Sequence, residues 1–165
     1  MKKIKLTLGQ FVLVDNSDFE WLNQWGWCAK VQKVLSDGKV KYIAVRGIYQ
    51  PDRKQNKIVK MHRLILNAPK DVTVDHINGN TLDNRRVNLR LATLSQNNKN
   101  KRSINYTGFK NVYLVPNSTR RWYAKIMVDR QSMFLGTFGS PQEAALVYNN
   151  AAQKYHGEFA RLNQI

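Results

Sequence analysis

Residues 72–100 read VTVDHINGNTLDNRRVNLRLATLSQNNKN, and this stretch decides the local fold at the centre of the chain. Its first four residues, 72–75, favour a short strand, and residues 89–92 favour a second one. The segment between them opens at 77–80 with residues that favour a turn. We therefore expect two short strands joined by a polar loop.

A helix is expected directly after the second strand. Residues 93–96 read TLSQ, a capping box, which predicts a helix that begins at Thr93 and carries Asn97 in its first turns. The first strand delivers Asp75 and His76 at its end. This order of elements is able to present Asp75, His76 and Asn97 to one point.

These three residues suit a particular chemistry. A carboxylate and an amide oxygen are hard ligands that suit Mg²⁺ or Mn²⁺. An imidazole beside them, with an ordinary pKa of about 6.5, is suited to act as general base on water. One metal ion held by Asp75 and Asn97 keeps positions open for a phosphate oxygen and a leaving oxygen. The pattern therefore favours metal-assisted hydrolysis of a phosphodiester.

Composition points to a polyanionic partner. The 165 residues include 27 Lys or Arg and 11 Asp or Glu, a formal charge of +16, and 42% are hydrophobic, enough for a packed core. We expect nucleic acid rather than a membrane, because the sequence contains neither an apolar run long enough to span a bilayer nor a long basic amphipathic helix. The single cysteine, Cys28, excludes a disulfide framework and a Cys-based zinc site, and its aromatic neighbours predict a core thiol.

The central stretch resembles the HNH endonucleases, in particular the branch found in phage and intron homing enzymes. The resemblance runs from about residue 62 to residue 100 and rests on Asp75-His76, on Asn88 thirteen residues after Asp75, and on Asn97 nine residues further. It implies a ββα-metal fold in which His76 is the general base and Asp75 and Asn97 are the metal ligands. It also implies that Asn88 holds the loop through hydrogen bonds to backbone.

Further residues of this segment have roles implied by the same resemblance. Asn97 stands where other branches have His, so a requirement for added metal is expected. His62 falls where the branch commonly has a His, and it either orients the site, touches phosphate or is structural. An isolated Asp-His pair is more commonly a turn or cap with a surface imidazole, but the positions of Asn88 and Asn97 favour the catalytic interpretation. The candidates for contacts to DNA phosphates are Arg85, Arg86, Arg90, Lys101 and Arg102.

The chain is expected to contain two domains of α+β class. A polar stretch at 95–103 separates a nuclease domain, residues 1–103, from a second domain, residues 104–165. The nuclease domain divides into a β-rich part, 1–60, with expected strands at 27–35, 40–46 and 58–60, and the motif at about 62–101. Its 20 basic and 8 acidic residues give it most of the charge. Trp21, Trp25 and Trp27 are expected in its core.

The second domain is predicted to be a three-stranded antiparallel sheet on one helix. Residues 111–115, 121–128 and 132–138 favour strands, and alternation gives the middle strand one apolar face and one charged, aromatic face. Residues 140–143 read SPQE, a capping box with Pro at the first helical position, and Gly157 is placed to end the helix. We expect this helix to pack against the sheet through Ala144, Val147, Tyr148, Ala151 and Tyr155.

Residues 108–163 resemble the APETALA-type domain of plant ethylene-response factors. The resemblance rests on the segments WYAKI at 122–126, LGTF at 135–138 and EAA at 143–145, and on Gly157-Glu158. It implies a sheet that lies in the major groove of DNA. Because the first strand departs from the plant pattern, no base preference carries over. The candidates for contacts to DNA are Tyr113, Arg120, Arg121, Trp122, Tyr123, Lys125 and Arg130.

The sequence thus predicts a metal-dependent HNH endonuclease that cuts double-stranded DNA, acts as a homing or nicking enzyme, and resides in the cytoplasm (the host's, if it is phage-encoded). One alternative is a non-catalytic, sequence-specific DNA-binding regulator with a degenerate HNH part, and another is an RNA- or structure-directed nuclease. The sequence favours neither a monomer nor a homodimer. A single site of this kind cuts one strand at a time.

Overall fold

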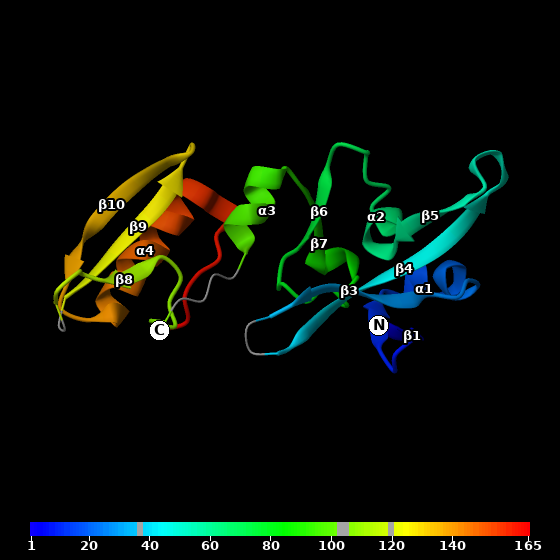
Figure 1. Ribbon diagram of the computed structural model, residues 1–165, viewed down its shortest axis with the longest axis horizontal. Helices are drawn as coiled ribbons and strands as arrows, with labels where there is room; N and C mark the ends of the chain where they lie inside the picture. Colours follow the sequence, from blue (N-terminus) through cyan, green and yellow to red (C-terminus); the bar gives the residue numbers. More distant parts are fainter. Residues whose placement is uncertain (36–37, 102–105, 119–120) are drawn as a thin grey trace. The chain divides into compact units, whose positions relative to one another are not determined.

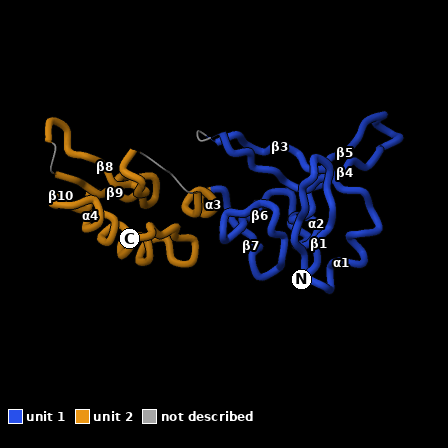
Figure 2. Tube along the Cα trace, turned by 90° about the horizontal axis from the view of Figure 1, so that it is seen from below, with its two compact units in different colours: residues 1–94 blue, residues 95–165 orange. Residues whose placement is uncertain are grey.

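The computed structural model describes residues 1–35, 38–101, 106–118 and 121–165, and it divides into two compact units, residues 1–94 (unit 1) and 95–165 (unit 2) (Figure 2). The division falls before the polar stretch in which the sequence places its domain boundary, so that stretch belongs to unit 2. Antiparallel sheets and a few helices make up both units, which confirms the mixed class expected from the sequence.

Unit 1 is built from hairpins with short helices between them (Figure 1). Its elements are β1 (Lys2–Lys5), β2 (Phe11–Val14), α1 (Asn16–Asn23), β3 (Cys28–Val34), β4 (Val40–Gln50), β5 (Gln55–Lys60), α2 (Met61–Ile65), β6 (Thr73–His76) and β7 (Leu89–Ala92). The strands form the sheets β1-β2, β3-β4-β5 and β6-β7, all antiparallel.

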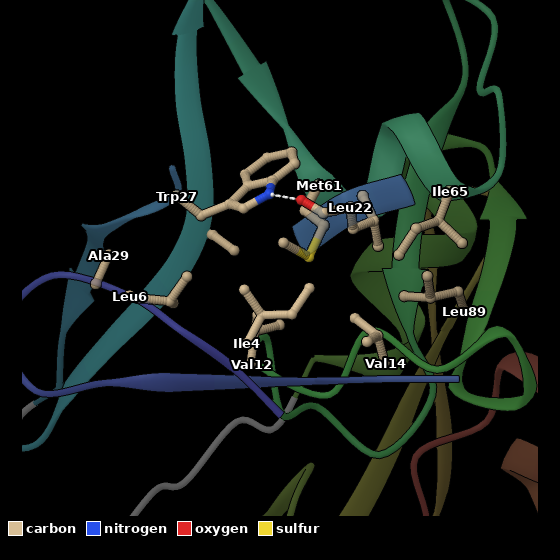
Figure 3. Packing of buried hydrophobic residues seen from close by; sticks show 11 residues of the cluster. Ile4, Leu6, Val12, Val14, Leu22, Trp27, Ala29, Met61, Ile65 and Leu89 are labelled. Carbon is tan, nitrogen blue, oxygen red and sulfur yellow. Dashed lines mark hydrogen bonds between the residues drawn. The ribbon is translucent and has the colours of Figure 1, made fainter. Parts of the chain in front are cut away.

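Apolar residues of unit 1 converge on one core (Figure 3). Alternation along β1 and β2 turns Ile4, Val12 and Val14 inward, as expected when one face of a hairpin is buried. Trp27 is buried and its Nε1 donates to the Leu22 carbonyl at 2.9 Å. The core also receives Met61 and Ile65 of α2 and Leu89 of β7, so it anchors the chain on both sides of β6, the strand that carries Asp75 and His76.

The tryptophans of unit 1 and Cys28 were all expected in its core. Trp27 lies in the core, and Trp21 and Trp25 pack against it partly buried, as predicted. Cys28, however, is exposed, so the prediction of a core thiol was wrong. It follows Trp27 directly in an extended strand, and successive side chains of a strand point to opposite faces.

Unit 2 places a helix behind a three-stranded sheet (Figure 1). Its elements are the helix α3 (Leu94–Asn100), which starts at the boundary, and then β8 (Val112–Leu114), β9 (Trp122–Val128), β10 (Gln131–Phe138) and α4 (Pro141–His156). The strand order is β10-β9-β8, and α4 packs on the sheet through a core of small side chains. Ala144, Ala145, Tyr148 and Ala152 are fully buried, whereas Tyr155, expected on this face, is exposed.

Within the described ranges, none of the helices combines the length and the apolar character needed to cross a bilayer.

Candidate active site

The β6–β7 hairpin positions Asp75 and His76 at the end of a strand. Asp75 lies opposite Arg90, and His76 lies opposite Leu89, whose side chain belongs to the core. Asp75 is 4% exposed and His76 is 7% exposed. A short strand of β-branched residues thus delivers two polar side chains into a buried setting, where polar groups need partners.

Asn88 holds the loop that follows His76. Its Oδ1 accepts a hydrogen bond from the Asn78 backbone N–H at 2.9 Å, and its Nδ2 donates to the Asp83 carbonyl at 2.7 Å. The Asn88 carbonyl also accepts from the Ile77 N–H at 2.9 Å. One buried amide therefore fixes both ends of the loop. The resemblance implies such hydrogen bonds to the loop backbone, while the catalytic role of Asn88 stays a prediction.

His76 is held by a buried amide. Its Nε2 lies 2.8 Å from Oδ1 of Asn84, a fully buried residue whose backbone N–H donates to the Leu13 carbonyl. Because an amide oxygen only accepts, this contact places a proton on Nε2 and leaves the lone pair of a neutral imidazole on Nδ1. Burial lowers the pKa of His76, although the Asn84 contact and the carboxylates of Asp75 and Asp83 act in the opposite direction. The imidazole is therefore neutral at pH 7.

His62 lies against His76. The two rings meet edge to face, with centroids 5.1 Å apart and planes at 78°. His62, on α2, is buried, and burial together with the neighbouring His76 lowers its pKa to about 3. The structure thus brings His62 and His76 together, while the role of His62 stays a prediction.

Asp75 is paired with Arg90 across the hairpin. Arg90 Nε and Nη2 both donate to Asp75 Oδ2, at 2.9 and 2.7 Å. A carboxylate has about four lone-pair positions, so a guanidinium and a metal ion are able to share it. The pair therefore orients the carboxylate without excluding it as a ligand.

Two further arginines of the motif are paired within unit 1. Arg85 Nε and Nη2 donate to the two carboxylate oxygens of Asp83 at 2.7 and 2.6 Å, and this contact lowers the pKa of Asp83. Arg86 Nε and Nη2 donate to both oxygens of the buried Asp18, each at 2.8 Å. A guanidinium has five N–H groups, so each retains donors beyond those used here.

The two expected metal ligands belong to different units. Asp75 is in β6 of unit 1, and Asn97 is in α3 of unit 2, so their joint coordination stays a prediction. The part of the chain that the structure describes contains no group of three or more His, Cys, Asp or Glu side chains suited to a metal. A metal ion here would depend on the oxygen atoms of one carboxylate and one amide, a donor set that fits Mg²⁺ or Mn²⁺.

Three of the candidate DNA contacts of unit 2, Tyr113, Tyr123 and Lys125, lie on the sheet face opposite α4. Tyr113 and Tyr123 are stacked with centroids 5.2 Å apart, and Lys125 Nζ lies 4.8 Å from the Tyr113 centroid. Arg121 and Arg130 are exposed beside the strands, whereas Trp122 packs against the core of the unit. Lys101 is exposed beyond α3; Arg102 and Arg120 lie outside the described residues.

Sequence reasoning missed two residues that the structure brings into these sites. Asn84 received no role from the sequence, and it proves to be the partner of His76. Phe134 of β10 is 64% exposed and lies 6.2 Å from the Tyr123 centroid, which extends the aromatic row. The alternation of side chains along the expected strand at 132–138 could have indicated which face Phe134 occupies. No local sequence pattern indicates the contact between Asn84 and His76.

Residues 59–99 match the model of the HNH endonuclease family. Over 114 residues the chain is also 33% identical to a protein of Acanthamoeba polyphaga mimivirus named as an uncharacterized HNH endonuclease. The aligned part is 65% of this chain and 58% of that relative, so the chain spans little more than half of the curated relative's length.

These findings establish an HNH endonuclease family domain in the chain, as the resemblance of the central segment implied. The match to the family model ends at residue 99. The resemblance of residues 108–163 to the APETALA-type domain therefore stays a prediction. No solved structure matches the chain.

Proposed function

We propose that this chain is a metal-dependent endonuclease that hydrolyses phosphodiester bonds of double-stranded DNA. The observation that carries the proposal is His76, a buried, neutral imidazole at the end of β6, next to the Asp75 carboxylate and held by Asn84. The family match over 59–99 supports the same activity.

In this mechanism, His76 takes the proton of the attacking water. Its Nε2 donates to Asn84, so Nδ1 is the atom that receives the proton. As His76 becomes positively charged, the carboxylates of Asp75 and Asp83 favour the protonated form. Asn88 keeps the loop after His76 in place, which fixes the direction of the imidazole.

Asp75 and Asn97 would hold one Mg²⁺ or Mn²⁺ ion in a ββα-metal arrangement formed by β6, β7 and α3. Such an ion, when bound, neutralises charge on the scissile phosphate and on the 3′ leaving oxygen. Arg90 orients the Asp75 carboxylate through two hydrogen bonds. The N–H groups that Arg85 and Arg86 retain are candidates for phosphate contacts.

The sheet of unit 2 is proposed to bind DNA, with base preference read by Tyr113, Tyr123 and Lys125. The stacked tyrosines and the nearby ammonium group form a flat aromatic and cationic face opposite α4. Aromatic and polar side chains suit contacts to bases, and an ammonium group suits contacts to phosphates. The apolar face that packs on α4 offers neither kind of contact. The expected biological role is a homing or nicking enzyme in a host cytoplasm, consistent with the viral source of the relative.

The activity is tested by incubating supercoiled plasmid with the native chain and Mg²⁺ or Mn²⁺. Nicked product is expected from the native chain, and chelation of the metal should stop its formation. His76→Ala should lower the rate by at least 10²-fold, within the range for removal of a general base. Asn23→Ala, which changes an exposed residue on α1, is the matched control.

Three results would contradict the proposal. Equal nicking by the native chain and by His76→Ala would indicate a contaminating nuclease or another base. Tight binding of DNA without any nicking would favour the non-catalytic regulator instead. Faster cutting of RNA or branched DNA than of duplex DNA would show that the substrate class is different.

A further inference from the structure

The hairpin of β4 and β5 extends beyond the sheet to which it belongs. β3 pairs with β4 only as far as Val45, whereas β5 pairs with β4 from Val45 to Gln50. Beyond Val45 the hairpin is therefore a two-stranded ribbon, roughly 16 Å long at ~3.3 Å per residue. Figures 1 and 2 both show its end standing out from the body of unit 1. We name residues 46–60 the arm.

The arm is exposed on both faces. Residues 47–49 and 51–58 are exposed, among them Ile48 (39%), Tyr49 (61%) and Ile58 (50%). An isolated two-stranded hairpin is marginally stable in water. The arm beyond its base leaves its apolar side chains exposed. A ribbon of this kind is expected to have a partner that covers it.

The arm also carries a concentrated positive charge. Five of its residues are basic and one, Asp52, is acidic, a net charge of +4. Arg53, Lys54 and Lys57 lie at or near its tip, and among the described residues their side chains form no hydrogen bond or ion pair within the chain. Arg85, Arg86 and Arg90 of the motif, by contrast, are each paired with a carboxylate.

These features match duplex DNA. The major groove, about 12 Å wide, admits a two-stranded β-ribbon. Cations at the tip fit phosphates, the amides of Gln55 and Asn56 are suited to base edges, and apolar side chains such as Tyr49 and Ile58 suit thymine methyl groups. We propose that the arm lies in the major groove of the DNA that this chain binds, and that Arg53, Lys54 and Lys57 contact phosphates there.

This inference rests on the proposed DNA substrate and adds a contact surface in unit 1, separate from the sheet of unit 2. A second copy of the chain, paired along the edge strand β5, is the other occupant to be tested. The basic residues along β5 would repel one another in such a pair, so DNA is the partner that complements them.

Affinity for DNA is the first test. A triple variant, Arg53→Gln, Lys54→Gln and Lys57→Gln, is compared with a control that loses equal charge elsewhere in unit 1 through Lys3→Gln, Lys5→Gln and Lys30→Gln, all exposed. The slope of log K against log salt for a mixed-sequence duplex should fall by about 2–3 for the arm variant, since each phosphate contact contributes about 0.9. Affinity should fall about 10- to 100-fold more than in the control. Equal affinities and slopes would overturn the proposal.

Crosslinking is the second test, and it reports contact directly. In a Cys28→Ser background, a photoreactive group is attached at Asn56→Cys or, as a control, at Asn23→Cys, an exposed position on α1. Position 56 should crosslink to duplex DNA and position 23 should not. Bulky groups at pyrimidine C5, which fill the major groove, should lower that yield. Crosslinks from 56 to another protein chain, or equal yields from both positions, would overturn the proposal.

Measuring both DNA binding and plasmid nicking by the native chain distinguishes a failure of the arm proposal from a failure of the endonuclease proposal. If it binds and nicks plasmid, but the arm variant and the control variant behave alike, only the arm assignment fails. If it binds DNA through the arm but does not nick, the endonuclease proposal fails while the arm assignment stands. If it does not bind DNA, both fail.

Discussion

At the scale of single residues, the site is organised by side chains that bind other side chains or the backbone rather than substrate. Asn84 holds His76, Asn88 holds the loop, and Arg90 holds Asp75. In a buried setting these bonds are strong, and an unpaired group is costly. The imidazole and the carboxylate are therefore oriented in the absence of any substrate.

Asn88 is the residue whose truncation best tests this orientation. In Asn88→Ala the Asn78 N–H and the Asp83 carbonyl lose their partner, which should cost about 2–3 kcal/mol of unfolding free energy. Plasmid nicking should slow at least 10-fold with a much smaller change in the Kd for DNA, because Asn88 is buried and acts through the direction of His76 rather than through a contact of its own to phosphate. Urea unfolding, nicking rates and anisotropy measure the three quantities. An unchanged rate would show that Asn88 has no part in positioning.

His62 makes stability depend on pH. Its folded-state pKa of about 3 lies below the ordinary 6.5, so between these values the unfolded chain binds more protons than the folded one. The stabilisation is complete above pH 6.5 and is lost as the pH falls toward 3, at up to about 1.4 kcal/mol per pH unit. His62→Gln should flatten this dependence.

The measurement is urea unfolding of unit 1 at pH 7, 6 and 5. In a Trp122→Phe background the remaining tryptophans, Trp21, Trp25 and Trp27, all lie in unit 1 and report its unfolding alone. Native and His62→Gln chains in this background are compared. Parallel stability curves for the two chains would contradict a buried, neutral His62.

At the scale of elements, the starts of α3 and α4 were predictable and the length of β4 was not. The capping boxes at 93–96 and 140–143 gave the starts of α3 and α4 within one residue, because a cap is a local hydrogen-bond pattern. β4 runs on to Gln50, although the expected strand ended at residue 46, and β5 begins at Gln55. Both strands of the arm are exposed on both faces, so no apolar alternation marks them.

The cap of α4 supplies a prediction at this scale. Ser140 Oγ accepts from the Glu143 N–H at 3.2 Å, and Glu143 Oε2 accepts from the Gly139 N–H at 3.3 Å. Ser140→Ala should lower the stability of unit 2 by about 1 kcal/mol. Trp122 fluorescence during urea unfolding, in a background with the other tryptophans replaced by Phe, measures the loss. Ser132→Ala, an exposed change on β10, should have no effect; a loss of equal size there would contradict a specific cap.

At the scale of the whole molecule, each unit has its own hydrophobic core and its own proposed task. Unit 1 holds His76, the proposed general base, and the arm, and unit 2 holds the aromatic sheet face and Asn97, a proposed metal ligand. Changes in the sheet face should therefore alter binding more than catalysis.

This division is testable in the full chain. Tyr123→Ala with Lys125→Ala removes an aromatic stack and a cation from the sheet face, and should raise the Kd for DNA about 10-fold. The nicking rate at saturating DNA should stay within about twofold of the native rate, because neither residue belongs to the catalytic set. Lys154→Ala, exposed on α4, is the control. A lower saturating rate with unchanged Kd would contradict the division of tasks.

The sequence by itself determined the motif spacing, the class of elements and the family of the central segment. These depend on local pattern: turn formers, caps, and the intervals among Asp75, His76, Asn88 and Asn97. Only the tertiary structure decided that Asn84 holds His76, that the motif arginines are paired with carboxylates, and that an exposed arm extends from unit 1. The Arg86–Asp18 and Arg90–Asp75 pairs join residues that are far apart in the chain, and the Asn84–His76 contact depends on the path of the loop between them. The strands of the arm lack an apolar face, so hydrophobic periodicity does not mark them.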